Sequence, residues 1–223
     1  MRRGGLPSDA AARLRVLAVE GSYHGDTLGA MDMQAPSVFN GPDQSPWYTP
    51  RGVFLTPPTA SCGADGVSWW LHPAQEGAPP LPPPRLFATR RALFDFEARA
   101  AEVAQYRRRI GSAIDAAEAA SPQALVGATV LEPVLHGAGG MVMVDPAFQR
   151  AALEESRARG IPVIADEVFV GLWRLGVASP CTQLLGLAPD IAAYGKLLTG
   201  GTVPLAATLA SEETFNAFRG ESR

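Results

Sequence analysis

Short apolar runs recur along the chain, separated by longer segments of mixed polarity. Leu14 to Val19 reads Leu-Arg-Val-Leu-Ala-Val, and Ala124 to Leu131 is apolar throughout apart from one threonine and one glycine. Ile161 to Ala165, Ile191 to Tyr194 and Pro204 to Ala210 have the same character. Apolar runs of this length, bounded by turn-forming residues, are typical of buried strands. The pattern therefore predicts at least five strands.

The segments between these runs predict helices. Asp145 followed by Pro146 has the pattern of a helix N-cap with proline at the first helical position, and Gly160 is a plausible stop. Residues 85 to about 120 are rich in alanine, arginine and glutamate, so this region is expected to contain an amphipathic, partly solvated helix. Strands that alternate with helices favour an α/β fold with a mostly parallel sheet.

One stretch departs from this alternation. Residues 36–84 contain twelve of the twenty prolines, together with several glycines. Because proline lacks the backbone N–H and restricts its neighbours, this density excludes long regular elements. We expect an irregular excursion here, with Trp47, Tyr48, Trp69 and Trp70 as aromatic anchors.

Polar residues stand at the ends of three predicted strands. Glu132 follows the run that ends at Leu131, Asp166 follows Ile161 to Ala165, and Lys196 lies just after Tyr194. Ligands of open α/β sheets collect at the carboxyl ends of the strands. We therefore expect these three side chains to share one site.

Asp166 and Lys196 each admit two interpretations. A carboxylate at the rim of a buried sheet needs a cationic partner, either a protonated pyridine nitrogen or an arginine such as Arg174, but it can also be a structural helix cap. A lysine in an apolar, glycine-flanked segment can be a nucleophile whose amine is activated by partial burial. The alternative is a solvated surface lysine.

The segment after the first strand offers a further candidate. Tyr23, His24 and Gly25 place a flat aromatic side chain and a close backbone approach at a strand end, which suits stacking on a planar molecule. A capped turn with an aromatic anchor is the other interpretation. Glu132-Pro133, followed by the glycine-rich turn 137–140, makes a comparable strand-end motif.

Composition narrows the classes of partner. The sequence is 47% hydrophobic and 18% charged with a net charge of -3, which gives no electrostatic basis for binding nucleic acid or an anionic membrane. There is no apolar run of the ~18 residues that a membrane span needs, and no signal-peptide core. Cys62 and Cys181 fit neither a disulfide framework nor a metal-ligand spacing. We expect no metal site and a reducing compartment.

The order of these motifs resembles the class III aminotransferases that depend on pyridoxal 5'-phosphate (PLP). The matching segments are Ser22-Tyr23-His24-Gly25-Asp26-Thr27, Glu132-Pro133 with Gly137-Ala138-Gly139-Gly140, Asp166-Glu167-Val168 with Gly171, Arg174 and Gly176, and Lys196 with Gly200-Gly201. The resemblance implies that residues 1–223 form an incomplete large domain of a fold-type I PLP-dependent transferase, in which helices flank a mostly parallel sheet.

The resemblance also implies roles for the matched positions. Lys196 would be the catalytic residue that forms the Schiff base with PLP and moves the proton, and Asp166 would pair with the pyridinium nitrogen. Tyr23 would line the substrate pocket near the cofactor ring, and His24 would lie beside that ring. Glu132 would orient neighbouring side chains.

Within the class, the chain resembles the subfamily of biotin synthesis that converts 8-amino-7-oxononanoate to 7,8-diaminononanoate with S-adenosylmethionine as amino donor, in its eukaryotic form fused to a dethiobiotin synthetase. Segments 23–32, 131–141, 196–210 and 45–58 carry this resemblance. Two departures from the family pattern are His136, where many relatives have glutamine, and Leu172-Trp173, where Phe-Gly is common.

Other functions stay open on the sequence. The chain could be another ω-amino acid transaminase or an aminomutase, because the motifs serve the cofactor more than the substrate. It could also be an inactive fragment, since residues 1–22 contain no match to the family's phosphate-binding turn.

The family resemblance also implies that the protein is a homodimer. A mitochondrial or cytoplasmic location is expected, with no targeting segment evident.

Overall fold

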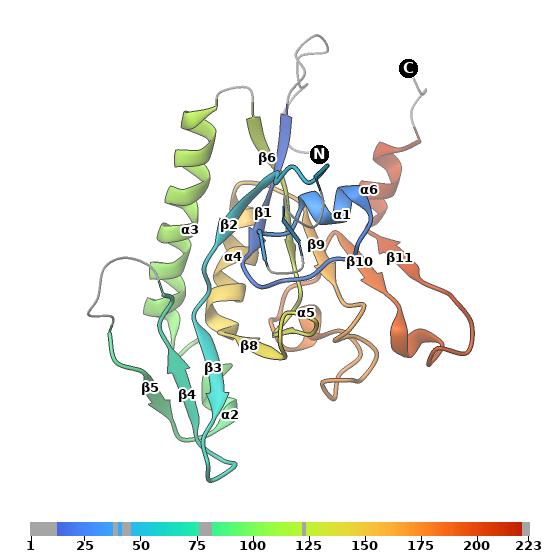
Figure 1. The fold of residues 1–223 in the computed structure, drawn as a ribbon. Helices are drawn as coiled ribbons and strands as arrows, with labels where there is room; N and C mark the ends of the chain where they lie inside the picture. Colours follow the sequence, from blue (N-terminus) through green and yellow to red (C-terminus); the bar gives the residue numbers. More distant parts are fainter. Residues whose placement is uncertain (1–12, 38–39, 42–45, 76–81, 122–123, 220–223) are drawn as a thin grey trace.

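Six strands form one large sheet in the order β11-β10-β9-β6-β1-β2 (Figure 1). The computed structural model describes residues 13–37, 40–41, 46–75, 82–121 and 124–219. The strands of this sheet are β1 (Arg13–Val19), β2 (Gly52–Leu55), β6 (Ala124–Leu131), β9 (Val163–Asp166), β10 (Ile191–Tyr194) and β11 (Ala207–Ala210). All neighbours pair in parallel except β10 and β11, which are antiparallel. The predicted α/β fold with a mostly parallel sheet is confirmed.

The predicted strand bounds hold closely except at two places. Strand β9 begins at Val163 and includes Asp166, so that carboxylate belongs to the last residue of the strand. The strand predicted from Pro204 begins only at Ala207. Proline has no N–H to donate to a neighbouring strand, which accounts for the later start.

A second, antiparallel sheet lies beside the first, with the order β5-β4-β3-β8-β7. Its strands are β3 (Thr59–Cys62), β4 (Trp69–His72), β5 (Arg85–Phe87), β7 (Leu135–His136) and β8 (Val142–Val144). The expectation of an irregular excursion over residues 36–84 is therefore wrong in part, because β2, β3 and β4 lie within it. Each has only four residues, and strands this short fit between the prolines.

The described helices are α1 (Leu28–Asp32), α2 (Arg90–Leu93), α3 (Ala100–Ala120), α4 (Pro146–Ala158), α5 (Pro180–Gln183), the 3₁₀ helix η1 (Lys196–Leu198) and α6 (Glu212–Ala217). Helices α3 and α4 pack against each other and against β6 of the large sheet (Figure 1). The helix predicted after Asp145 is confirmed, since this side chain accepts a hydrogen bond from the N–H of Ala147. None of the described helices has both the length and the apolar character needed to cross a bilayer.

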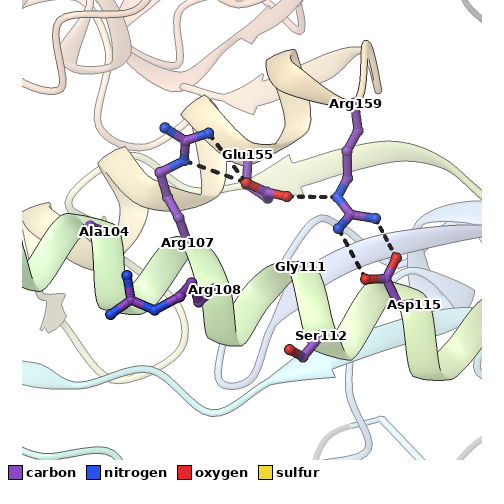
Figure 2. A pocket seen from close by; sticks show the side chains of 8 residues that line it. All are labelled: Ala104, Arg107, Arg108, Gly111, Ser112, Asp115, Glu155 and Arg159. Atoms are coloured by element: carbon purple, nitrogen blue, oxygen red, sulfur yellow. Dashed lines mark hydrogen bonds and ion pairs between the residues drawn. The ribbon is translucent and has the colours of Figure 1, made fainter.

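Gly111 allows α3 and α4 to approach closely. A Cβ at this position would lie 2.9 Å from Nη2 of Arg159 and 3.0 Å from Oε1 of Glu155. Figure 2 shows Glu155 of α4 and Arg159, which directly follows α4, extending towards α3, where they border a hollow together with Arg107, Arg108 and Asp115. A side chain at position 111 would collide with them.

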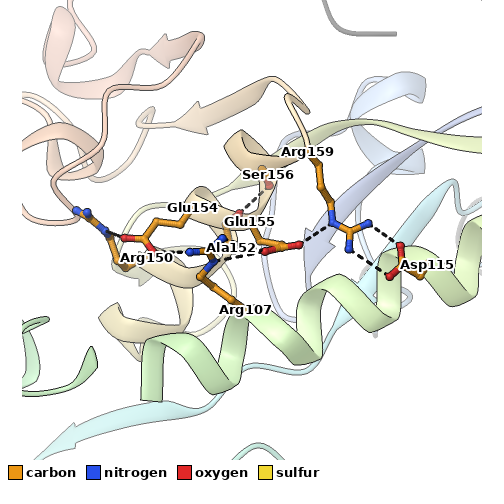
Figure 3. A network of polar contacts seen from close by, with 8 residues as sticks. All are labelled: Arg107, Asp115, Arg150, Ala152, Glu154, Glu155, Ser156 and Arg159. Atoms are coloured by element: carbon orange, nitrogen blue, oxygen red, sulfur yellow. Dashed lines mark hydrogen bonds and ion pairs between the residues drawn. The ribbon is translucent and has the colours of Figure 1, made fainter. Parts of the chain in front are cut away.

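Ion pairs link most of the charges around this hollow. Figure 3 shows the chain of ion pairs, in which Arg159 binds Asp115 at 2.6 Å and Glu155 at 2.7 Å. Arg107 lies 3.4 Å from Glu155, and Glu154 links Arg107 to Arg150. The hollow itself is lined by three arginines, Arg107, Arg108 and Arg159, and by two carboxylates, Asp115 and Glu155, so its lining carries one positive charge in excess. The network joins the two helices along their exposed faces.

A buried ion pair fixes the start of α4. Arg99 is 3% exposed, and its guanidinium donates two hydrogen bonds to the carboxylate of Asp145, at 2.7 and 2.8 Å. The same guanidinium donates to the carbonyl of Leu93 at 2.8 Å and to Glu102 at 2.8 Å. Burial of two charges is tolerated only with such complete pairing.

Candidate functional site

A cavity of about 410 Å³ lies at the carboxyl ends of the central parallel strands. It is lined by Tyr23, His24, Gly25, Glu132, Gly137, Ala138, Asp166, Val168, Phe169 and Lys196. The lining residues come from the segments after β1, β6, β9 and β10, which are consecutive neighbours in the sheet. All five candidate residues expected from the sequence therefore border one cavity.

Asp166 pairs with His24. The Nδ1 atom of His24 lies 2.8 Å from Oδ2 of Asp166, and the backbone N–H of Val168 donates to Oδ1 at 3.1 Å. Of the two partners considered for Asp166, Arg174 is not the one found, because it donates instead to the carbonyl of Phe169. The side chain of His24 is buried, and its Nε2 has no hydrogen-bond partner among the described residues. These two hydrogen bonds fix the orientation of the Asp166 carboxylate, which lines the cavity.

Glu132 joins two of the loops that form the site. Its carboxylate is 3% exposed and accepts the backbone N–H of Tyr23 at 2.9 Å and of Gly137 at 3.0 Å. Burial raises the pKa of this carboxyl group, although the two N–H donors act in the opposite direction. The side chain thus orients backbone segments that lie more than a hundred positions apart.

The phenol of Tyr23 stays protonated over the ordinary pH range. Burial is the main cause that raises its pKa, and a hydrogen bond to Asp26 adds to the effect. Its ring therefore forms an uncharged aromatic wall of the cavity.

Lys196 borders the cavity and is exposed, so the partial burial assumed in the interpretation of Lys196 as a buried nucleophile is not present. Its backbone φ of 44° lies in the left-handed region, which is uncommon for residues other than glycine. The N–H of Gly200 donates to the Lys196 carbonyl at 2.9 Å, and both Gly200 and Gly201 have positive φ. The glycine pair therefore forms a tight turn.

Phe169 is a lining residue that the sequence did not single out. A Cβ at Gly137 would lie 2.6 Å from Cδ1 of the Phe169 ring, so the ring sits directly on that glycine. The residue stands within the motif that begins at Asp166, but a motif carries no information on the direction of an apolar side chain. Only the contact with Gly137 identifies it.

The turn at residues 137–140 packs against the turn before Tyr23, and Gly139 is the point of contact. A Cβ at position 139 would lie 1.8 Å from the carbonyl oxygen of Gly21, which is backbone and cannot rotate away. We expect Gly139→Ala to cost about 1–3 kcal/mol of unfolding free energy or more, measured by urea denaturation. Gly29→Ala is the matched control, since no atom lies within 4 Å of its added Cβ. Equal stabilities of the two variants would contradict this contact.

His136 is buried beside the site, and within the part of the chain that the structure describes its Nε2 has no hydrogen-bond partner. Burial, with a smaller contribution from His24, lowers its pKa from 6.5 to about 4. Between pH 6.5 and about 4, the His136 imidazole is therefore protonated in the unfolded chain but not in the folded chain. Because the unfolded chain binds the extra proton, the unfolding free energy decreases as the pH falls through this range.

Replacing His136 with glutamine should remove this dependence. Between pH 7 and pH 4 the native chain should lose about 3 kcal/mol more unfolding free energy than His136→Gln. Urea denaturation at the two pH values measures the difference. Parallel losses in both proteins would show that His136 titrates normally in the folded state.

Leu172 and Trp173 replace the common Phe-Gly, and both have positive φ, at 55° and 68°. Their N–H groups donate to the carbonyls of Ala178 and Val177 at 2.9 Å, which closes the turn. A glycine would adopt this conformation at Trp173 without strain. Leu172 and Trp173 nevertheless adopt this backbone conformation, and their two hydrogen bonds close the turn before Arg174.

Comparison with known proteins assigns the family. The family described as aminotransferase class-III matches residues 72–223. The chain is 49% identical over 211 residues to a bifunctional dethiobiotin synthetase/7,8-diamino-pelargonic acid aminotransferase of Arabidopsis thaliana named as mitochondrial, covering 94% of the chain and 25% of the relative. The similarly named protein of Oryza sativa subsp. japonica is 43% identical, covering 98% of the chain and 27% of the relative.

A solved structure shows the same fold. An amine transaminase from an uncultivated Pseudomonas species, described as PLP-bound, superposes with a TM-score of 0.65 at 23% identity, covering 93% of this chain and 39% of that one. The chain spans about a quarter of the length of the two plant relatives. The expected family and the fold of a partial PLP-dependent transferase domain are both confirmed. The chain belongs to the class III aminotransferases.

Proposed function

We propose that the protein of which this chain is part transfers an amino group with PLP as cofactor, and that Lys196 carries the cofactor. The observation that supports this most is the cavity in which an amine, a carboxylate and an aromatic ring converge, on Lys196, Asp166 and Tyr23. These three residues are far apart in the sequence, and the fold brings them to one cavity. When bound, PLP acts as an electron sink that allows an amino group to move between two carbon compounds.

The cavity fits this cofactor. Its volume of about 410 Å³ lies in the range of small-molecule sites. Val168, Phe169 and Tyr23 offer apolar surface for a flat ring. Asp166, held by His24 and by a backbone N–H, is a fixed negative charge for a protonated ring nitrogen.

Each residue then has a defined task. Lys196 supplies the nucleophilic amine and later holds the proton that moves at the reacting carbon. His24 donates from Nδ1 to Asp166 and so restricts the rotation of this carboxylate. Glu132 keeps the Tyr23 backbone and the 137–140 turn at fixed positions, and Tyr23 covers the reacting groups from one side.

The substrate pair that we propose is 8-amino-7-oxononanoate as acceptor and S-adenosylmethionine as donor. The support comes from the relatives, since the Arabidopsis and rice proteins are named as 7,8-diamino-pelargonic acid aminotransferases. A relative from Synechococcus elongatus named adenosylmethionine-8-amino-7-oxononanoate aminotransferase is 34% identical over 92% of the chain and 39% of its own length.

An assay of the full-length protein tests this assignment. The protein is incubated with PLP, 8-amino-7-oxononanoate and S-adenosylmethionine, and 7,8-diaminononanoate is measured by mass spectrometry. Parallel reactions contain ornithine or 4-aminobutyrate. Formation of the diamine supports the proposal, whereas turnover of ornithine or 4-aminobutyrate without any diamine would assign the protein to another ω-amino acid transaminase. An absence of turnover with every pair would contradict the proposed activity.

The remaining proposals concern the whole protein. We propose that residues 1–223 are part of the large, cofactor-binding domain, that the protein is a homodimer as the family resemblance implies, and that it acts in mitochondria. The last point is supported by the word mitochondrial in the names of the two plant relatives. Size-exclusion chromatography with light scattering and a fluorescent fusion would test the dimer and the location.

A further inference from the structure

The chain bends sharply between Glu132 and the turn at residues 137–140. The N–H of Leu135 donates to the carbonyl of Pro133 at 2.9 Å, and Val134 between them has a φ of 72°. This combination defines a γ-turn with positive φ at its central residue, a form that is rare and strained. A positive φ is a genuine outlier for a β-branched residue such as valine. Such a conformation persists only where the surrounding structure holds it in place.

Gln149 of α4 is the side chain that holds this turn. Its Nε2 donates to the carbonyl of Glu132 at 2.8 Å, and its Oε1 accepts the N–H of Val134 at 2.6 Å. The two bonds end on the main chain on either side of Pro133, which has no N–H of its own. Gln149 is fully buried, so water cannot replace either bond. An amide suits this position because it offers a donor and an acceptor at the same time.

The backbone that Gln149 holds carries the carboxylate of Glu132. This carboxylate accepts the N–H groups of Tyr23 and Gly137, at 2.9 and 3.0 Å. The position of Gln149 is itself fixed, since its backbone N–H donates to the carbonyl of Asp145, the buried N-cap of α4, at 3.1 Å. Hydrogen bonds therefore connect the start of α4 to two of the loops that border the cavity.

We propose that Gln149 is a positioning residue of the site, which holds the strained turn at Val134 and thereby directs the carboxylate of Glu132 towards the two loops. The inference rests on the proposed function, because the loops matter to the reaction only if the cavity between them is the active site. Gln149 does not line that cavity. Its effect passes through the main chain of residues 132–134.

Gln149→Met removes both hydrogen bonds and keeps a side chain of similar length. Amide hydrogen exchange of the full chain, freed of cofactor and read at single residues by mass spectrometry, should then become faster at Tyr23 and Gly137 by a factor on the order of 10 to 100. The N–H of Val163 is the internal reference, because it also donates to a carboxylate, that of Asp190, at 2.7 Å. Its exchange should change much less. Gln149→Asn keeps an amide but is one methylene shorter, and should have the same effect at smaller size.

Ser156→Ala is the matched control on the same helix. Ser156 is also fully buried, and its hydroxyl contacts the hydroxyl of Thr129 and the carbonyl of Ala152, both at 2.7 Å. These contacts lie apart from the turn at residues 132–134. The variant therefore removes a buried polar group from α4 without freeing the turn, and exchange at Tyr23 should not become faster relative to Val163.

Val134→Gly tests whether the strained turn connects Gln149 to the site. Glycine adopts a positive φ without strain, so Gln149→Met should accelerate exchange at Tyr23 and Gly137 less in the Val134→Gly background than in the native chain. In the full-length protein, the double variant should also recover part of the kcat that Gln149→Met loses in diamine formation. A side chain that only filled space would not be rescued by the removal of a second one. Val134→Asn, which also tolerates a positive φ, replaces Val134→Gly if that variant does not fold.

Two results would overturn the proposal. One is an equal acceleration at Tyr23, Gly137 and Val163 in Gln149→Met, and the other is the absence of rescue by the substitution at Val134. If Gln149→Met does not fold by circular dichroism, Gln149→Asn decides, and native exchange at Tyr23 and Gly137 in that variant would count against the role of Gln149. Because the exchange measurement needs neither PLP nor turnover, its outcome is separate from that of the substrate assay.

Discussion

Lys196→Ala should abolish transamination, with a fall in kcat by a factor on the order of 10⁴ to 10⁶, as expected for the loss of a covalent nucleophile that also moves a proton. The amine borders the cavity together with the carboxylate of Asp166, and within the described residues no second lysine can replace it. The rate of diamine formation by the full-length protein measures the loss.

A chemical readout separates catalysis from folding. Reduction with borohydride should leave a pyridoxyl group on the peptide that contains Lys196 in the native protein, and on no peptide of the 223-residue segment in Lys196→Ala. Lys196→Arg is the matched control, because it keeps the positive charge but not a nucleophilic amine, and it should be equally unlabelled. A native protein that turns over substrate without labelling at position 196 would refute the assigned role.

Arg99→Ala should lower the unfolding free energy by about 3–5 kcal/mol, because it leaves the buried carboxylate of Asp145 without its partner. Asp145 is fully buried, and two of the hydrogen bonds from Arg99 end on it. The variant also frees the carbonyl of Leu93. Urea denaturation followed by circular dichroism measures the change.

The matched control lies on helix α3, which begins directly after Arg99. Arg108 is exposed and its replacement by alanine should change stability by no more than about 0.5 kcal/mol. Asp145→Ala should lose at least as much stability as Arg99→Ala, since it also removes the N-cap of α4. A loss of less than about 1 kcal/mol in Arg99→Ala would show that the buried pair is solvated in solution.

Much of the fold could be predicted, because short apolar runs and helix-capping residues mark the strands and helices within a few positions of the chain. Ile191–Tyr194 is the strand that its apolar run predicts, and Asp145-Pro146 begins a helix for reasons that act within a few residues. The short strands within residues 36–84 could not be predicted, because two of them pair with strands distant in sequence: β2 pairs with β1, and β3 pairs with β8. Strand β4 then pairs with β3 and β5.

The site was predictable as a set of residues but not as a set of contacts. The strand-end rule brings Glu132, Asp166 and Lys196 together, and the structure agrees. The pairing of Asp166 with His24 depends on which side chain the loop after β1 turns towards its neighbour, which no periodicity encodes. The same is true of Phe169, whose importance comes from the missing side chain of Gly137.

The order of strands has a kinetic consequence. His24 and Asp166 are 142 positions apart in the chain, yet their strands are separated by β6 alone. Contacts between such distant segments form slowly, because the loop must close before parallel pairing stabilises it. The His24–Asp166 contact can therefore arise only after β1, β6 and β9 have assembled. Acquisition of cofactor would then mark the completion of folding, and its rate would measure how fast the centre of the sheet is built.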